Sequence, residues 1–358
     1  MILKSLALKQ YRSYERLGVH FDDGINILQG KNAAGKTNVL EAIGFLSFGK
    51  SFRTTKDTEC IRDGQDAAYI KGTVAKTEGQ MSIEAQISRT GAKSLKVNAQ
   101  PIRRMGDLFG NFIAVVFAPE DLKVLKESPS LRRRFMDMEI SKLYPTYFFD
   151  LQEYQKALAQ KNALLKSRMK EEQLKKLVGI YNEQLAAHGE KIMCARQTFI
   201  DRIDALSRDI HADLSDGETL SLRYMRSVSG DDIKAALLAR MDKSLAAEIE
   251  QGCCLCGPHR EDIAVSLGGA QIKAYSSQGQ IRTAMLSLKL ATLELAKADY
   301  GARPVLLLDD VFSELDVARQ AALLHHVSGI QCFITTAVPV SNAPGRVLDV
   351  ADSTVVPR

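Results

Sequence analysis

Two short segments at opposite ends of the chain carry residues suited to binding a nucleotide. The first fits the phosphate-binding pattern G-x-x-x-x-G-K-[ST] and reads Gly30-Lys31-Asn32-Ala33-Ala34-Gly35-Lys36-Thr37. The second is an apolar run that ends in two carboxylates, Asp309 and Asp310. In sites of this kind the lysine reaches the β- and γ-phosphates and the threonine hydroxyl holds Mg²⁺. We therefore predict one ATP site to which both segments contribute.

Each residue of this site has an expected role. Backbone N–H groups from Gly30 to Asn38, at the start of a helix, form an anion site for the phosphates. Lys36 is a predicted catalytic residue because it contacts the β- and γ-phosphates, and Thr37 and Asp309 are the predicted magnesium ligands. Asp310 points elsewhere, so it is the candidate for orienting or activating the attacking water.

The spacing of apolar residues predicts the elements that must position this site. Residues 25–28 enter the loop as a strand and residues 37–48 leave it with helical periodicity, which is the context that the motif requires. The same patterns predict strands at 2–9, 16–21 and 112–117. Later in the chain they predict a helix at 278–298, a strand at 305–309, a helix at 318–327 and a final strand at 331–335.

Two longer regions differ in pattern from the rest. Residues 68–102 alternate between apolar and polar positions, which predicts an antiparallel meander with one wet face. From about residue 130 to residue 214 the pattern is helical, with an apolar stripe made of Ile192, Phe199, Ile203, Leu206, Ile210 and Leu214. Strands resume at 262–267 and 271–275.

These elements predict an α/β fold: a P-loop ATPase head with a mixed sheet and an antiparallel meander, interrupted by an inserted α-helical lobe. The expected borders are 1–120 for the N-terminal half of the ATPase lobe, 121–260 for the inserted lobe and 261–358 for the C-terminal half. The stripe in the inserted lobe is read as core packing, and it is too short and interrupted for a long coiled coil.

Composition narrows the class of protein. The chain has 358 residues, of which 45% are hydrophobic and 25% charged, the balance of an ordinary globular protein. No apolar stretch reaches the roughly 18–20 residues of a membrane span, and Lys9 and Arg12 end the apolar start too early for a signal peptide. We therefore expect a cytoplasmic protein with no membrane contact.

The charge and cysteine patterns leave alternatives open. The net charge of +5 does not by itself argue for nucleic-acid binding. The densest basic point, Arg132-Arg133-Arg134, is either a solvated helix face, a brace for the nucleotide domain or a set of DNA phosphate contacts. The cluster Cys253, Cys254 and Cys256 lacks a C-x-x-C pair, so ordinary buried thiols are expected there rather than zinc.

A third segment decides the subclass of ATPase. Before the helix at 278–298 stands Ser276-Ser277-Gln278-Gly279-Gln280. It resembles the Ser-x-Gly-Gln signature of the ABC ATPase superfamily, in which this turn contacts the ATP held by a partner subunit. A hydroxyl, bare glycine amides and a helix N-terminus all favour a phosphate. The resemblance implies a head-to-tail homodimer, formed with ATP, that has two nucleotides between its subunits.

The segment after the two carboxylates supports the same resemblance and also departs from it. Ser313-Glu314-Leu315-Asp316 is similar to the superfamily's D-loop, which lies across the dimer interface. Where many relatives place a histidine, this chain has Thr335-Thr336, so any γ-phosphate contact there is a hydroxyl. Asp310 is also shorter than the glutamate common in transporters. Both departures favour slow, switch-like hydrolysis.

Beyond these motifs, the whole chain resembles the RecF family, bacterial recombination-mediator ATPases related to the SMC proteins. The residues that carry the resemblance are Gln10-Tyr11-Arg12-Ser13-Tyr14, residues 35–43, Phe117-Ala118-Pro119-Glu120-Asp121-Leu122, residues 128–137 and Gly257-Pro258-His259-Arg260-Glu261-Asp262. The resemblance implies a weak, DNA-stimulated ATPase that dimerises on ATP, holds duplex or gapped DNA and, with RecO and RecR, helps to load RecA at single-strand gaps. His259 and Arg260 either serve the site or tie the lobes together.

Other classes fit less well. A transporter subunit predicts a Leu-Ser-Gly-Gly-Gln signature and a switch histidine, which the chain lacks. An SMC-type or double-strand-break head needs hundreds of coiled-coil residues between its motifs. The alternative that stays open is a regulatory latch that binds nucleotide without needing hydrolysis.

Overall fold

The computed structural model describes all residues except 78, 168, 216, 273–275, 302 and 339–344, and the side chain of Ser313. The chain forms two compact units. The first unit comprises Met1–Leu122, Leu206–Thr219 and Ser276–Arg358, and the second comprises Lys123–Ala205 and Leu220–Tyr275. The expected inserted lobe, 121–260, shares 123–205 and 220–260 with the second unit, whereas 206–219 cluster with the first.

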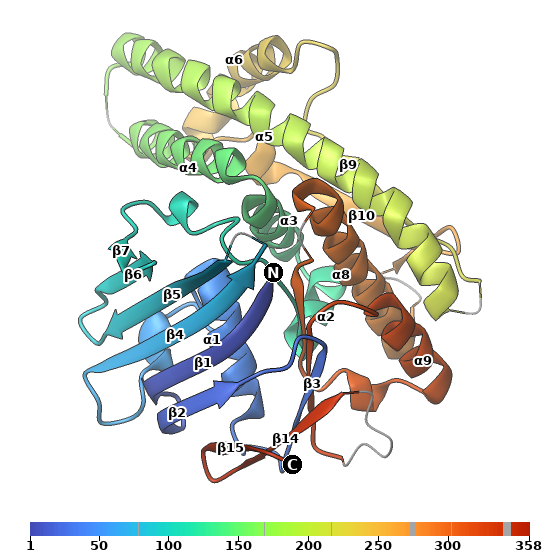
Figure 1. The fold of residues 1–358 in the computed structure, drawn as a ribbon. Helices are drawn as coiled ribbons and strands as arrows, with labels where there is room; N and C mark the ends of the chain where they lie inside the picture. The colour runs from blue at the N-terminus through green and yellow to red at the C-terminus, as the bar shows by residue number, and fades with distance from the viewer. Residues whose placement is uncertain (78, 168, 216, 273–275, 302, 339–344) are drawn as a thin grey trace. The chain divides into compact units, whose positions relative to one another are not determined.

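The first unit contains an antiparallel sheet built from the N-terminal part of the chain (Figure 1). Its strand order is β2-β1-β4-β5-β6-β7, and the strands are β1 (Ile2–Tyr11), β2 (Tyr14–His20), β4 (Ala67–Lys76), β5 (Gly79–Ser88), β6 (Lys93–Val97) and β7 (Gln100–Pro101). Buried and half-exposed residues alternate along β4 and β5, as expected for a sheet with one wet face. The predicted meander is therefore confirmed.

The first unit also contains a mixed sheet with the order β15-β14-β3-β13-β12-β8. Its strands are β3 (Ile25–Gln29), β8 (Ala114–Phe117), β12 (Val305–Leu308), β13 (Cys332–Thr336), β14 (Arg346–Ala351) and β15 (Thr354–Pro357). All pairs are parallel except β14 with β15. The prediction that the strand at 331–335 would end the pattern is wrong, because β14 and β15 follow it and extend the sheet past β3.

Helix α1 (Lys36–Phe48) contacts strands of both sheets, including β4, β8 and β13. Its apolar side chains, among them Val39, Ile43 and Phe45, are fully buried in the core of this unit. Because β3 leads directly into the loop before α1, and β12 and β13 end at the same edge of the parallel sheet, the phosphate-binding loop, Asp309 and Asp310 lie at that edge. The remaining helices of the unit are α8 (Gln278–Tyr300), α9 (Val317–His326), η1 (Asp57–Cys60), η2 (Met105–Asp107), η3 (Pro119–Asp121) and η5 (Phe312–Glu314).

The second unit is mainly helical. It contains α3 (Pro129–Leu143), α4 (Pro145–Leu165), most of α5 (Glu171–Leu214), α6 (Ile233–Gln251), η4 (Pro258–Arg260) and a sheet of β9 (Leu220–Met225), β10 (Asp262–Leu267) and β11 (Ala270–Gln271). The short helix α2 (Leu122–Lys126) precedes them. The helical prediction for 130–214 is confirmed, and its apolar stripe is buried except for half-buried Leu206. Strand β9 was not predicted, and part of the strand expected at 271–275 lies outside the described residues.

Two further findings bear on the expectations from composition. Cys254 and Cys256 are buried and Cys253 is half-buried, all without a disulfide. In the part of the chain that the structure describes, no helix is both long and apolar enough to cross a bilayer.

Candidate nucleotide-binding site

The phosphate-binding loop lies between β3 and α1 and borders a hollow of about 290 Å³, called the P-loop hollow below. The residues that line it are Asn32, Ala33, Gly35, Lys36, Thr37, Asn38, Arg53 and Asp310. Gly35 caps α1 with a φ of 107°, and a Cβ there would lie 2.7 Å from the Tyr14 hydroxyl. Only glycine fits both the backbone and this close approach.

Lys36 is the central cation of the loop. Its side chain is buried, and Nζ donates hydrogen bonds to the carbonyls of Gly30 at 2.8 Å and Lys31 at 2.9 Å. The ammonium is therefore held within the loop by backbone oxygens, which an incoming phosphate can replace as acceptors.

The structure brings the first motif and the second motif together. Thr37 Oγ1 donates to Oδ1 of Asp309 at 2.8 Å, although 272 residues separate the two in sequence. Burial raises the pKa of Asp309, and hydrogen bonds from Thr37 and Thr335 oppose that shift. A threonine hydroxyl beside a carboxylate is a pair of hard oxygen donors, which fits Mg²⁺.

Asp310 stands apart from Asp309 in conformation and in surroundings. Its φ is 52°, uncommon for a residue with a side chain, and its N–H donates to Oγ1 of Thr335 at 2.8 Å. Asp310 lines the P-loop hollow, so the structure places it where it can act on a bound nucleotide or water. The two adjacent acids thus have different surroundings: Asp309 bonds to Thr37, and Asp310 lines the P-loop hollow.

Arg53 is a site residue that the sequence analysis missed. It lines the P-loop hollow, and its Nη1 donates to Oδ1 of Asn38 at 3.1 Å. The same nitrogen lies 3.7 Å from a carboxylate oxygen of Glu41. A guanidinium at this position can offer charge and hydrogen bonds to a phosphate. No sequence motif includes Arg53. It reaches the P-loop hollow because of the conformation of the loop that follows α1.

The hairpin turn between β1 and β2 contacts the phosphate-binding loop and the first turns of α1. Arg12 forms a two-point ion pair with Glu41 of α1, with N···O distances of 2.8 and 2.6 Å, and Glu41 is fully buried. This partner raises the pKa of Arg12. Asn38 donates to the Ser13 hydroxyl at 3.1 Å, and Tyr14 donates to the Gly35 carbonyl at 3.2 Å. The Gln10–Tyr14 segment is therefore part of the site's framework.

The predicted signature residues 276–280 do not line the P-loop hollow of their own chain. Ser277 caps α8, and its side chain accepts the backbone N–H of Gln280 at 3.2 Å, while the side-chain oxygen Oε1 of Gln280 accepts the backbone N–H of Ser277 at 2.8 Å. Ser277, Gln278 and Gly279 are exposed. The turn thus presents a capped helix N-terminus to the surface.

The D-loop segment is tied to the signature helix and begins α9. Glu314 forms an ion pair with Arg282 of α8 at 2.6 Å, and Asp316 accepts the N–H of Arg319 at 2.9 Å as the cap of α9. Val317 next to this cap is 82% exposed.

The tri-arginine segment lies in the second unit. Arg132 is buried, and it forms a two-point ion pair with Asp262 at 2.6 and 2.7 Å. Arg133 donates to the Glu261 carbonyl at 2.7 Å, and burial lowers its pKa. Arg134 alone of the three is exposed. The buried guanidinium of Arg132 serves the packing of this unit and is not available to a phosphate.

His259 and Arg260 make their contacts inside the second unit. His259 shares a hydrogen bond of 2.7 Å with the Tyr154 hydroxyl and one of 3.1 Å with the Cys254 carbonyl. Arg260 donates to the same carbonyl and to the Cys253 sulfur. These contacts fix the loop before β10, and neither residue lines the P-loop hollow.

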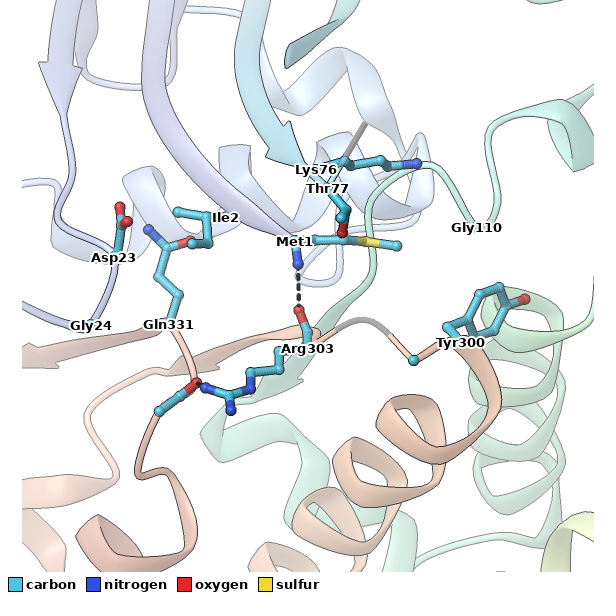
Figure 2. A pocket seen from close by; sticks show the side chains of 12 residues that line it. Met1, Ile2, Asp23, Gly24, Lys76, Thr77, Gly110, Tyr300, Arg303 and Gln331 are labelled. Carbon is cyan, nitrogen blue, oxygen red and sulfur yellow. Dashed lines mark hydrogen bonds between the residues drawn. The ribbon is translucent and has the colours of Figure 1, made fainter. Parts of the chain in front are cut away.

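A larger hollow of about 760 Å³ lies at the amino ends of the parallel strands, where Gly24, Arg303 and Gln331 precede β3, β12 and β13 (Figure 2). Of its polar groups, the Met1 ammonium donates to the Arg303 carbonyl at 3.0 Å, and the Gln331 side-chain amide bonds to the backbone of Leu3. Parallel sheets bind ligands at their carboxyl edge. The smaller P-loop hollow is therefore the candidate nucleotide site.

The sequence has close curated relatives. The family described as RecF/RecN/SMC N terminal domain matches residues 2–342. The DNA replication and repair protein RecF of Alkaliphilus oremlandii is 42% identical over 346 residues, which are 94% of this chain and 94% of that protein. The protein of the same name from Clostridium tetani is 40% identical over 341 residues, 94% of this chain and 92% of that protein.

Solved structures of RecF and of an Smc head domain are also similar to this chain. A recombination mediator protein RecF solved with ATP superimposes with a TM-score of 0.93 at 35% identity, covering all of this chain and 97% of that one. An Smc head domain from Pyrococcus furiosus, solved with the C-terminal domain of ScpA, superimposes with a TM-score of 0.58 at 18% identity, which is a likeness of fold alone.

Proposed function

Because this chain belongs to the RecF family of DNA replication and repair proteins, we propose that it is an ATP-dependent clamp on DNA that dimerises when ATP binds and hydrolyses ATP slowly. The observation that carries the proposal is the separation of two phosphate-binding features. Thr37 lines the P-loop hollow and donates a hydrogen bond to Asp309, while the signature turn of the same chain does not line this hollow.

The P-loop hollow is the proposed site for the nucleotide phosphates. Lys36 exchanges its carbonyl acceptors for phosphate oxygens, and Thr37 and Asp309 hold Mg²⁺, which neutralises phosphate charge. Asp310 orients or activates the attacking water, and Arg53 stabilises charge on the terminal phosphate. The solved RecF relative that binds ATP supports this assignment.

The signature turn is proposed to act on the ATP of a second copy. Ser277 and Gly279 present a hydroxyl and amides at an exposed helix N-terminus, an arrangement that favours anions. The exposed Val317, next to the D-loop, gives the same face an apolar residue that a second copy would cover. Two chains placed head to tail would then hold two ATP molecules.

Slow turnover is proposed from the residues around the attacking water. Thr335-Thr336 stand where many relatives place a histidine. The Thr336 hydroxyl donates to the Val338 carbonyl, and the Thr335 hydroxyl is already committed to Asp309 and to the N–H of Asp310. It is therefore poorly placed to serve the γ-phosphate. Asp310 reaches less far than a glutamate would. Slow hydrolysis suits a clamp that stays closed on DNA and is reset once.

The proposed biological role follows from the family. A solved relative is described as a recombination mediator in the RecFOR pathway. We place this chain in the same role, holding duplex or gapped DNA and, with RecO and RecR, helping to load RecA at single-strand gaps.

Sedimentation of the purified protein with Mg²⁺, with and without ATP and a short gapped duplex, tests this proposal. The wild type is expected to dimerise with ATP, and more strongly on DNA. Ser277→Arg should bind ATP but stay monomeric, while Ser94→Arg, which changes an exposed serine on β6, should dimerise as the wild type does. A wild type that stays monomeric with ATP and DNA would overturn the clamp.

A further inference from the structure

We propose that Glu218 is a positioning residue for the signature turn, holding the Gln280 side chain in the orientation that the partner's nucleotide requires. This inference rests on the function proposed above. Glu218 lies in the segment 206–219. In the sequence this segment stands between two segments of the second unit, but it is part of the first unit. Glu218 belongs to neither the phosphate-binding motif nor the signature motif.

Glu218 fixes the Gln280 amide from one side. Its Oε1 accepts a hydrogen bond from Gln280 Nε2 at 2.7 Å. The other end of the amide, Oε1 of Gln280, accepts the N–H of Ser277 at 2.8 Å. Because a carboxylate only accepts and a backbone N–H only donates, both ends of the amide are committed and it has one orientation. The capped turn and Glu218 together leave Gln280 no free rotation.

A buried histidine faces the other oxygen of the same carboxylate. His211 has no exposed surface, and its Nε2 lies 3.6 Å from Oε2 of Glu218 without a hydrogen-bond partner. Its Nδ1 lies 3.0 Å from the Ser287 hydroxyl, whose hydrogen goes to the Thr283 carbonyl. His211 therefore donates from Nδ1, and its Nε2 lone pair points at Glu218.

This arrangement connects two points of one helix. Ser287 and Gln280 both belong to α8, and His211 and Glu218 span the distance between them from outside the helix. Burial lowers the pKa of His211, and Glu218 raises it. Arg319 of α9, which donates to the Leu214 carbonyl, also lowers this pKa. An amide at position 218 would accept from Gln280 and also donate to His211 Nε2.

The test compares Glu218→Ala with Glu218→Gln. Glu218→Ala should weaken ATP-dependent dimerisation about tenfold and lower kcat similarly, as expected for loss of a hydrogen bond to a charged group, while the ATP Kd of the monomer stays within twofold. Glu218→Gln should restore both. Glu294→Ala, which removes from α8 a carboxylate that pairs with Lys297, is the matched control and should behave as the wild type.

A double-mutant cycle with Gln280→Ala separates an effect that Glu218 exerts through Gln280 from an effect on the rest of the fold. If Glu218 acts through Gln280, Glu218→Gln and Glu218→Ala should be alike in the Gln280→Ala background. If the wild type dimerises with ATP and Glu218→Ala dimerises equally well with an unchanged kcat, the positioning role is overturned, but the proposed clamp is not. A wild type that does not dimerise with ATP would instead overturn the clamp itself.

Discussion

Thr335 donates its hydroxyl hydrogen to Oδ1 of Asp309 at 2.9 Å, and both side chains are buried. The oxygen of that hydroxyl also accepts the N–H of Asp310 at 2.8 Å. Since Thr335 lies on β13 and the acids follow β12, one hydroxyl joins two neighbouring strands at the point where the carboxylates emerge. This residue sets the position of both acids.

Replacing Thr335 with valine removes the hydroxyl and keeps the shape. We expect kcat for ATP hydrolysis to fall about tenfold, because the Asp310 N–H loses its partner at a cost of about 1–3 kcal/mol. Binding of ATP should change less than about twofold, since Thr37 still donates to Asp309. Steady-state hydrolysis and ATP titration measure the two effects. Thr335→Ser should retain wild-type kcat, and a normal kcat in Thr335→Val would contradict the bridging role.

Replacing Asp310 with asparagine tests whether hydrolysis is needed. Asparagine tolerates the positive φ of this position, so the backbone should be preserved. If Asp310 activates the water, single-turnover hydrolysis should fall by roughly 10²–10⁴-fold while ATP binding and dimerisation persist. Failure of this variant to support DNA repair in cells would show that turnover matters. Normal repair without hydrolysis would favour the regulatory latch.

Removing the buried Glu41 carboxylate should destabilise the first unit. Glu41→Ala leaves Arg12, whose side chain is only 20% exposed, without its partner, and we expect a loss of about 3 kcal/mol in the free energy of unfolding. Glu15→Ala is the control because Glu15 pairs with Arg62 at the surface; it should cost less than about 1 kcal/mol. Urea unfolding followed by circular dichroism measures both, and equal losses would contradict the argument.

Protonation of His259 should destabilise the second unit. Burial lowers the pKa of His259 to about 4, so the folded chain keeps this imidazole neutral where the unfolded chain protonates it. Stability is therefore fully present above about pH 6.5 and is lost as the pH falls toward 4, by up to roughly 3 kcal/mol. Urea midpoints from pH 7 to pH 4 should fall less steeply in His259→Gln. His325→Gln, at an exposed position, should keep the wild-type slope.

Local motifs predicted much of the fold and the site. The P-loop and the strand before Asp309 are marked by short patterns, and the ABC-type ATPase head with an inserted helical lobe is confirmed by the related structures. Strand β9 carries the buried alternation of Leu220, Leu222 and Tyr224, but it is only six residues long and follows a helix, so its pattern was too brief to stand out.

The residues that sequence reasoning missed depend on contacts between distant segments. Arg53 enters the P-loop hollow through the loop after α1, which Glu41 and Ser51 hold in place by a hydrogen bond. Glu218 acquires its place only because residues 206–219 return to the first unit. Neither position has a periodicity or a motif of its own, so only the folded chain reveals them.

The strand order of the mixed sheet has a consequence for how the protein is made. Within the part of the chain that the structure describes, strand β3 pairs with β13 and β14, which follow it by about 300 residues. At roughly 5–20 residues per second, β3 remains without a partner for roughly 15–60 s of synthesis, while every strand of the antiparallel sheet is already available. The phosphate-binding loop therefore leaves the ribosome well before Asp309 and β13, and nucleotide binding must wait until these later segments have been translated.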